Sequence, residues 1–320
     1  MRRLRQLLMI AGVLGLAGGA LAADDDISWA FPRTAPGGPP GARATDVPLS
    51  VPGSTQHFST VQLRNRFEVS DWFPASHPAA PAAVLHGHPP GTMACGFCHL
   101  PDGEGRPENA PLAGLPAAYI QRQVRDIASG ARLPLDPSWG PTTGMQQVAR
   151  AATPAEVAQA AAYFSKLKYR SLVRVVEAAH PPGTVPDASI YRLTGAAASP
   201  EKTPRIIEAA DDFARFEQRD ASAGYVAYVP VGAIARGKLL ATTGGHGTTQ
   251  RCSTCHGGNL QGGLGPPLAG RSPSYLFRQL YAFRSGARHG AGGAPMKPVV
   301  ARLATADMVD LAAYAGSLKP

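Results

Sequence analysis

All four cysteines of the 320-residue chain fall in two copies of one pattern, and about 0.001 such matches are expected from composition. The copies are Cys95-Gly-Phe-Cys98-His99 and Cys252-Ser-Thr-Cys255-His256. Two thiols three residues apart can add to the two vinyl groups of a haem from one helical turn, and the adjacent histidine then lies under the iron. The pattern therefore predicts two covalently attached haem c groups, held by four thioethers, with His99 and His256 as proximal iron ligands.

Three other uses of C-x-x-C pairs fit less well. A disulfide within such a pair closes a tiny loop and stabilises little. A thioredoxin-like redox pair needs a preceding strand, and it does not require the histidine that follows each pair here. A zinc site built from two such pairs usually has a spacer of about 15–20 residues, whereas more than 150 residues separate the motifs here.

A duplication accompanies the two motifs. Residues 111–132 align with residues 267–288, and 11 of the 22 positions are identical. Tyr119 and Tyr275 are predicted to begin matching helices. A second helix is predicted after Thr153, where a capping threonine precedes a proline and a glutamate, and its counterpart begins near Thr305. The sequence thus predicts two tandem haem units, each ending in a helix.

These features resemble the class I cytochromes c, and the tandem arrangement resembles the bacterial periplasmic diheme cytochromes of the c4 type. Gly265-Pro-Pro-Leu-Ala-Gly270 carries the resemblance most clearly. The resemblance covers about residues 78–168 and 230–320, and it does not cover 23–77 or 169–229. It implies that the backbone carbonyl of Pro266 accepts a hydrogen bond from the proximal histidine. The first unit departs from the family pattern, because Ala110 stands at that position, and a less rigid loop is expected there.

The resemblance also implies a methionine as the second iron ligand of each haem. Met145 and Met296 are the candidates, because each lies 18 residues before a matching tyrosine and in a loop that contains Gly and Pro. Met93 is too close to its cysteine, and Met308 lies on the apolar stripe of the last helix, where packing is expected. Three histidines compete with these methionines: His289 in the second unit, and His86 or His88 in the first.

The expected fold is mainly α, with two tandem class I cytochrome c domains, a long irregular N-terminal arm and an inter-domain linker. Short strands are expected in the linker at Val173-Arg-Val-Val and Tyr225-Val-Ala-Tyr-Val. The predicted segments are a signal peptide at 1–22, a Pro/Gly-rich arm at 23–77, cytochrome c domain 1 at 78–168, the linker at 169–229 and cytochrome c domain 2 at 230–320.

The first 22 residues combine Arg2, Arg3 and Arg5 with an apolar run that is short for a membrane span, which predicts secretion to the periplasm. An uncleaved anchor is the alternative. The formal charge of +9 falls to +6 without those three arginines, which suits an acidic partner or an anionic membrane surface at which the protein associates peripherally. Nucleic acid is not an expected partner, because no dense basic stripe with interleaved aromatic residues is present.

What the resemblance implies is electron transfer without a substrate and without catalytic residues. The expected donor is a dehydrogenase or a quinol-oxidising complex, and the expected acceptor is an oxidase or another cytochrome. Two alternatives stay open: a diheme peroxidase-type enzyme, and a dedicated cytochrome subunit of a larger dehydrogenase complex. A diheme thiosulfate-oxidising enzyme fits less well, because such enzymes often use a further cysteine as an iron ligand and all four cysteines here belong to the motifs.

Overall fold

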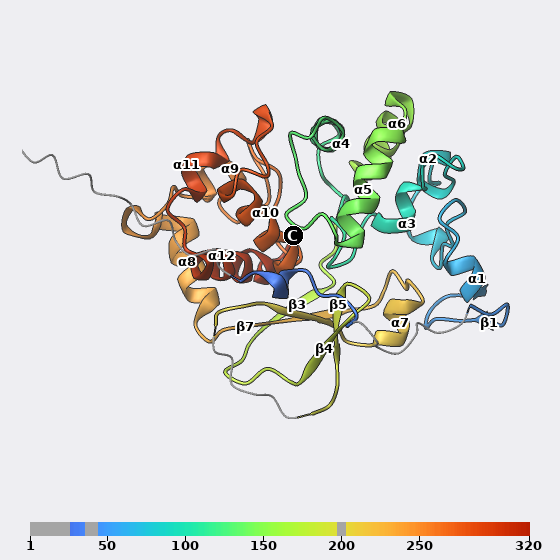
Figure 1. Ribbon diagram of the computed structural model, residues 1–320, viewed down its shortest axis with the longest axis horizontal. Coiled ribbons are helices and arrows are strands. Elements are labelled where there is room, and N and C mark those ends of the chain that lie inside the picture. Colours follow the sequence, from blue (N-terminus) through green and yellow to red (C-terminus); the bar gives the residue numbers. More distant parts are fainter. Residues whose placement is uncertain (1–25, 36–43, 197–202) are drawn as a thin grey trace, which may run out of the picture.

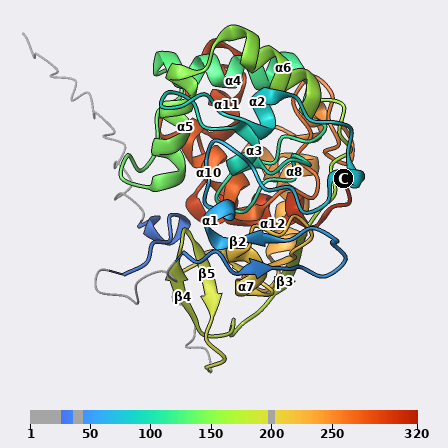
Figure 2. The same cartoon turned by 90° about the vertical axis from the view of Figure 1, so that its right-hand side faces the viewer.

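The computed structural model describes residues 26–35, 44–196 and 203–320. The predicted signal peptide lies outside these residues. Two groups of helices stand side by side on a β-sheet at one end of the molecule (Figures 1 and 2). Within the described residues, no helix is long and apolar enough to cross a membrane.

The first group of helices surrounds the first C-x-x-C-H motif. It consists of α2 (Ala82–Leu85), α3 (Cys95–His99), α4 (Ala117–Ser129), α5 (Gly140–Ala151) and α6 (Pro154–Phe164). Thr153 and Glu156 form the predicted capping box at the start of α6. Gly130 ends α4 in the left-handed conformation, which a glycine adopts without strain. Helices α4 and α6 bury one apolar cluster between them, which includes Ile120 and Phe164.

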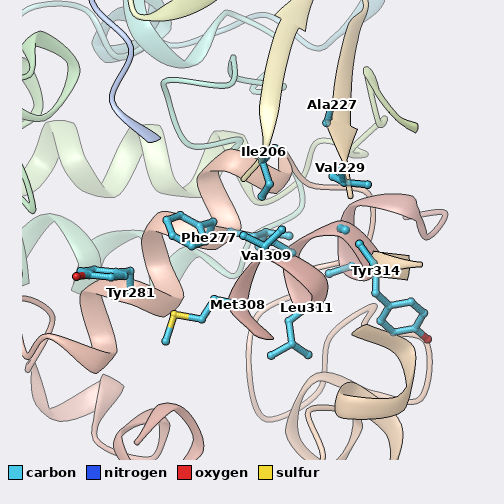
Figure 3. Packing of buried hydrophobic residues seen from close by; sticks show 14 of the residues in the cluster. Ile206, Ala227, Val229, Phe277, Tyr281, Met308, Val309, Leu311 and Tyr314 are labelled. Carbon is cyan, nitrogen blue, oxygen red and sulfur yellow. The ribbon is translucent and has the colours of Figure 1, made fainter. Parts of the chain in front are cut away.

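The second group repeats this order around the second motif. It consists of α8 (Ala233–Thr243), η3 (Gly245–Gly247), α9 (Ser253–His256), α10 (Pro273–Arg284), η4 (Ala291–Gly293), α11 (Met296–Val300) and α12 (Thr305–Ser317). Helices α8 and α12 cross closely at Gly237, where a Cβ atom would lie 2.0 Å from the Asp310 carbonyl oxygen. Phe277, Met308 and Val309 pack in the core between α10 and α12 (Figure 3). The packing role predicted for Met308 is confirmed, because its side chain is fully buried.

A five-stranded mixed sheet occupies the region predicted as a linker. Its strands are β3 (Val173–Glu177), β4 (Thr184–Asp187), β5 (Ile190–Leu193), β6 (Ile207–Ala210) and β7 (Tyr225–Val229), in the order β3-β7-β6-β5-β4. The strands β3 and β7 were both predicted, and they pair in parallel. They lie against α12, and the short helix α7 (Phe213–Glu217) precedes β7. The segment is therefore a packed layer rather than a simple connection.

The N-terminal segment is less irregular than expected. It forms η1 (Ser28–Ala30), a two-stranded sheet of β1 (Pro48–Leu49) and β2 (Phe58–Ser59), α1 (Thr60–Leu63) and η2 (Pro74–Ser76). Trp29 lies 4.4 Å from Phe277 between ring centroids, and Phe31 packs edge-on against Trp139. Most of the described residues of the arm lie outside helices and strands, as predicted, but the arm is packed, because burying two aromatic rings holds the chain between the two helical groups.

We expect Trp29→Ala to lower the free energy of unfolding by about 3–5 kcal/mol, because it removes a large buried side chain from the main core. Val47→Ala is the matched control, since Val47 lies in the same N-terminal segment and is 62% exposed. Urea unfolding of the haem-loaded chain measures both. Equal stability of the two variants would show that the segment does not contribute to the core.

Candidate haem-binding sites

Each motif histidine is buried and held by one hydrogen bond from its ring. His99 Nδ1 lies 2.7 Å from the Ala110 carbonyl oxygen, and His256 Nδ1 lies 2.7 Å from that of Pro266. Since a carbonyl only accepts, each Nδ1 carries the proton and each Nε2 is left with a lone pair for a metal. Burial lowers the pKa of both imidazoles, which keeps them neutral. The contact expected at Pro266 is confirmed, and Ala110 keeps it in the first unit.

A cavity of about 200 Å³ opens beside the first motif. Cys95, Cys98 and His99 line it from α3, apolar side chains of α4, α5 and α6 line much of the remainder, and Gln123, Arg132 and Gln279 form a polar part of the wall. An apolar cavity with a few convergent polar groups is typical of a cofactor site. The residues present suit a haem attached through both thiols and bound by Nε2 of His99.

Two methionines line this cavity, and one of them was excluded by the sequence reasoning. Met145 lies on α5, so the prediction that it sits in a loop is wrong: Gly140 and Pro141 begin a helix there, as proline at a first turn often does. Met93 lies beside it, and its methyl carbon is 3.6 Å from the place of a Cβ on Gly144. Its closeness to Cys95 in sequence does not keep Met93 out of the cavity.

In the second unit, Met296 is the first residue of α11 and follows the predicted Gly/Pro loop. It packs with Cys252 against the main hydrophobic core. The competing histidine there, His289, is exposed, and its ring contacts the Gly286 carbonyl at 3.0 Å. That position favours Met296 over His289.

The competing histidines of the first unit lie at the surface. His88 Nδ1 lies 2.6 Å from a Glu156 carboxylate oxygen. His86 borders the cavity, but its side chain is 52% exposed and lies 3.5 Å from Glu68. Both imidazoles thus have carboxylate neighbours in solvent, which favours a methionine as the second ligand.

The geometry also speaks against the other uses of C-x-x-C pairs. All four cysteines carry free thiols. Burial raises the pKa of the Cys95 thiol to about 12 and that of Cys252 to about 11, so neither is the reactive thiolate of a redox pair at neutral pH. Across the described parts of the chain, no three His, Cys, Asp or Glu side chains are placed to hold a metal ion together.

The two units meet through equivalent positions of the duplication. Arg132 donates to Gln123 at 3.0 Å and to Gln279 at 2.8 Å, and Arg288 donates to Gln123 at 2.7 Å and to Gln279 at 3.0 Å. Arg288 also donates to the Tyr119 hydroxyl. Gln123 aligns with Gln279 and Arg132 with Arg288, each pair 156 residues apart in the duplication. The contact therefore has a local two-fold symmetry.

Two buried arginines of α10 and the turn before it reach across to the first unit. Arg271 donates to the carbonyls of Pro111 and Ala113 at 2.8 and 3.2 Å. Arg278 donates to the carbonyls of Ala30 and Pro107. These contacts were not predicted, because the sequence does not indicate which backbone carbonyls a distant arginine meets.

The comparisons with known proteins agree with this geometry. The Cytochrome c family model matches residues 234–319. The chain is 40% identical over 68 residues to cytochrome c-554(548) of Halomonas halodenitrificans, which is 21% of this chain and 82% of that one. It is 26% identical over 248 residues to cytochrome c4 of Azotobacter vinelandii, which is 75% of this chain and 90% of that one. The chain belongs to the cytochrome c family, and over three quarters of its length it is similar to a cytochrome c4.

Among solved structures, the thiosulfate dehydrogenase TsdBA of Marichromatium purpuratum aligns with a TM-score of 0.46 and 27% identity. The alignment covers 71% of this chain and 36% of that one, so this chain spans about a third of its length.

We expect Met145→Ala to remove the far-red sulfur-to-iron absorption band of the haem at Cys95 and Cys98, because the iron loses its thioether ligand. Met93→Ala should keep the band if Met145 is the ligand, since Met93 would then only border the same cavity. The visible spectrum of each oxidised, haem-loaded variant measures this. Loss of the band in Met93→Ala alone would make Met93 the ligand instead, and Met308→Leu is the control for packing.

A pH dependence of stability is expected from Glu104. Burial, and then the charge of Asp102, raises the pKa of Glu104 to about 8, although Arg170 lies 3.1 Å away. A solvated glutamate has a pKa of 4.5, so the folded chain binds a proton there that the unfolded chain releases. The resulting stability is fully present below pH 4.5 and is lost as the pH rises through about 8.

Urea unfolding between pH 5 and 9 measures this effect. Glu104→Gln should flatten the decline across that window, because the amide cannot ionise. Glu217→Gln, at an exposed site, should leave the decline unchanged. A wild-type chain whose stability rises over the window would contradict the raised pKa.

Proposed function

We propose that the chain binds two haem c groups and carries electrons without transforming a substrate. Cys95 and Cys98 would hold one haem and Cys252 and Cys255 the other, with His99 and His256 as proximal ligands and Met145 and Met296 as distal ligands. Bound in this way, the haem irons supply the electron-accepting centres, and His/Met ligation raises their reduction potential.

The observation that carries the proposal is the paired arginines between the units. Arg288 is buried and Arg132 is partly buried. Both guanidinium groups donate to side-chain amides, and Arg288 also donates to a tyrosine hydroxyl. Burial, and then Arg288, lowers the pKa of Arg132. Two adjacent cations with neutral partners need an anion nearby. The carboxylates of haem would meet that need, because Arg132, Gln123 and Gln279 border the cavity of the first motif.

The hydrogen bonds of the proximal histidines support the same role. A ligand whose Nδ1 is fixed by a backbone carbonyl reorients little when the iron changes charge, and small reorientation favours fast electron exchange. The apolar walls of the cavity exclude water, which favours a stable ligand pair over an open, reactive iron.

The proposed partners are redox proteins, with a dehydrogenase or quinol-oxidising complex as donor and an oxidase or another cytochrome as acceptor. We place the protein in the periplasm, where c-type cytochromes related to this chain typically occur and where the N-terminal segment would direct it. Peripheral association with a membrane surface fits the positive charge of +6 that remains after signal removal.

Spectroscopy of the purified, haem-loaded chain tests this proposal. Two low-spin haems that do not bind carbon monoxide, do not turn over peroxide and are not reduced by thiosulfate are expected, because both ligand positions are filled. A high-spin haem that binds carbon monoxide, or turnover of peroxide or thiosulfate, would exclude a pure carrier and indicate an enzyme.

A further inference from the structure

A second hollow, of about 680 Å³, adjoins the cavity of the first motif. The two share six residues in their walls: Met93, Cys98, Glu108, Asn109, Pro141 and Gly144. Four separate parts of the chain form the hollow: the N-terminal segment around α1, the first motif with the loop that follows it, the start of α5, and the region of β4, β5 and α7. The last of these lies in the inserted sheet, outside the part that resembles class I cytochromes.

Four arginines border the hollow, against two glutamates. The arginines are Arg64, Arg66, Arg106 and Arg219, and the glutamates are Glu108 and Glu217. Arg106 is buried and lies 3.0 Å from Glu108, so those two charges balance. Positive charge is therefore in excess on the remaining wall, where Arg219 faces the motif residue Phe97 at 4.1 Å from the ring centroid. Burial, and then the neighbouring Arg106, lowers the pKa of Arg219 to about 10.

Arg219 occupies a backbone position that usually belongs to glycine. It follows α7 with a φ of +58°, in the left-handed region, and its N–H bonds to the Phe216 carbonyl. A side chain other than glycine or asparagine is strained there, because its Cβ approaches the backbone. Glycine would end α7 equally well. The backbone turn therefore does not explain the arginine, and its guanidinium does.

The N–H groups of Arg219 have no acceptor. Among the residues that the structure describes, its guanidinium makes no hydrogen bond and no ion pair; it stacks on the Phe97 ring and lies within electrostatic reach of Glu108 and Cys98. Since a guanidinium carries five N–H donors, stacking on a ring leaves all of them available in the plane. These donors face the hollow, and a ligand with several acceptor oxygens would match them.

A haem carboxylate does not fit this place. Cys98, which borders the hollow, binds a vinyl carbon, and the porphyrin carries its propionates on the two pyrrole rings away from the vinyl groups. The cluster of Gln123, Arg132 and Gln279 borders the other cavity and suits those propionates. The hollow is therefore left for a different anion.

We propose that this hollow binds a small divalent oxyanion, tetrahedral like sulfate, at Arg219, with Arg66 as a second positive residue in the same wall. Bidentate hydrogen bonding to a guanidinium suits such oxygens. The exposed Glu217 on the rim repels the extended acidic surface of a protein or nucleic acid but leaves a small ion room to enter. A bound dianion beside the thioether edge would stabilise the ferric state of the first haem and lower its potential.

Titration calorimetry of sodium sulfate into the haem-loaded full chain, in sodium chloride at constant ionic strength, tests the proposal. Arg219→Gln should weaken binding by about tenfold or more, since charge-assisted hydrogen bonds are lost. Arg219→Gly should weaken it equally, and it removes the left-handed strain, which guards against a folding defect. Arg174→Gln is the matched control: it removes the same charge from the sheet, at an exposed ion pair with Asp211.

Sulfate should also lower the potential of one haem in the wild-type chain and in Arg174→Gln, but not in Arg219→Gly. Absence of sulfate binding to the wild-type chain would overturn the proposal, and so would equal weakening in Arg174→Gln. Salt-sensitive binding of an acidic redox partner without sulfate binding would overturn it in favour of a docking surface. The binding result does not depend on whether the protein is a carrier or an enzyme.

Discussion

The contact between Arg132, Arg288 and their two shared glutamines is the interaction on which the arrangement of the units depends. Each guanidinium donates to both Gln123 and Gln279, so each arginine needs a glutamine of the other unit to complete its hydrogen bonds. The backbone reinforces the contact, because the Leu133 N–H donates to Ala287 and the His289 N–H donates to Ala131. A duplicated segment that meets its own copy in this way fixes a single relative orientation, since a shift of either unit would break both halves together.

The same interface compensates for the departure of the first unit from the family pattern. Ala110 in place of proline leaves the carbonyl that orients His99 on a more flexible backbone. Arg271 binds the carbonyls of Pro111 and Ala113 just after it, and Arg278 binds that of Pro107 just before it. Contacts from the second unit thus hold the loop in place of a proline ring at position 110. These contacts oppose the loss of rigidity that was expected for the first unit.

Features that depend on local sequence could be predicted, and features that depend on distant partners could not. The capping box at Thr153 and the start of α12 at Thr305 follow from short-range rules. Strand β6 (Ile207–Ala210) was missed because it is buried on both faces and shows no alternation. Met93 was excluded on sequence distance, although the backbone between Met93 and Cys95 lets the side chain turn into the cavity. The hollow around Arg219 needs four segments that only the tertiary fold brings together.

The inserted sheet and the N-terminal segment make the two units chemically unlike, although they descend from one repeat. Beside the first motif the insertion adds arginines and a polar hollow, so the thioether edge at Cys98 lies behind charged side chains. At the second motif Cys255 is exposed, and Leu264 nearby is 93% exposed. A small apolar edge suits the weak, rapid contacts of redox partners, whereas a charged hollow selects by charge. A symmetric protein would offer the same face at both ends, and the insertion removes that symmetry, so the two motifs present different surfaces.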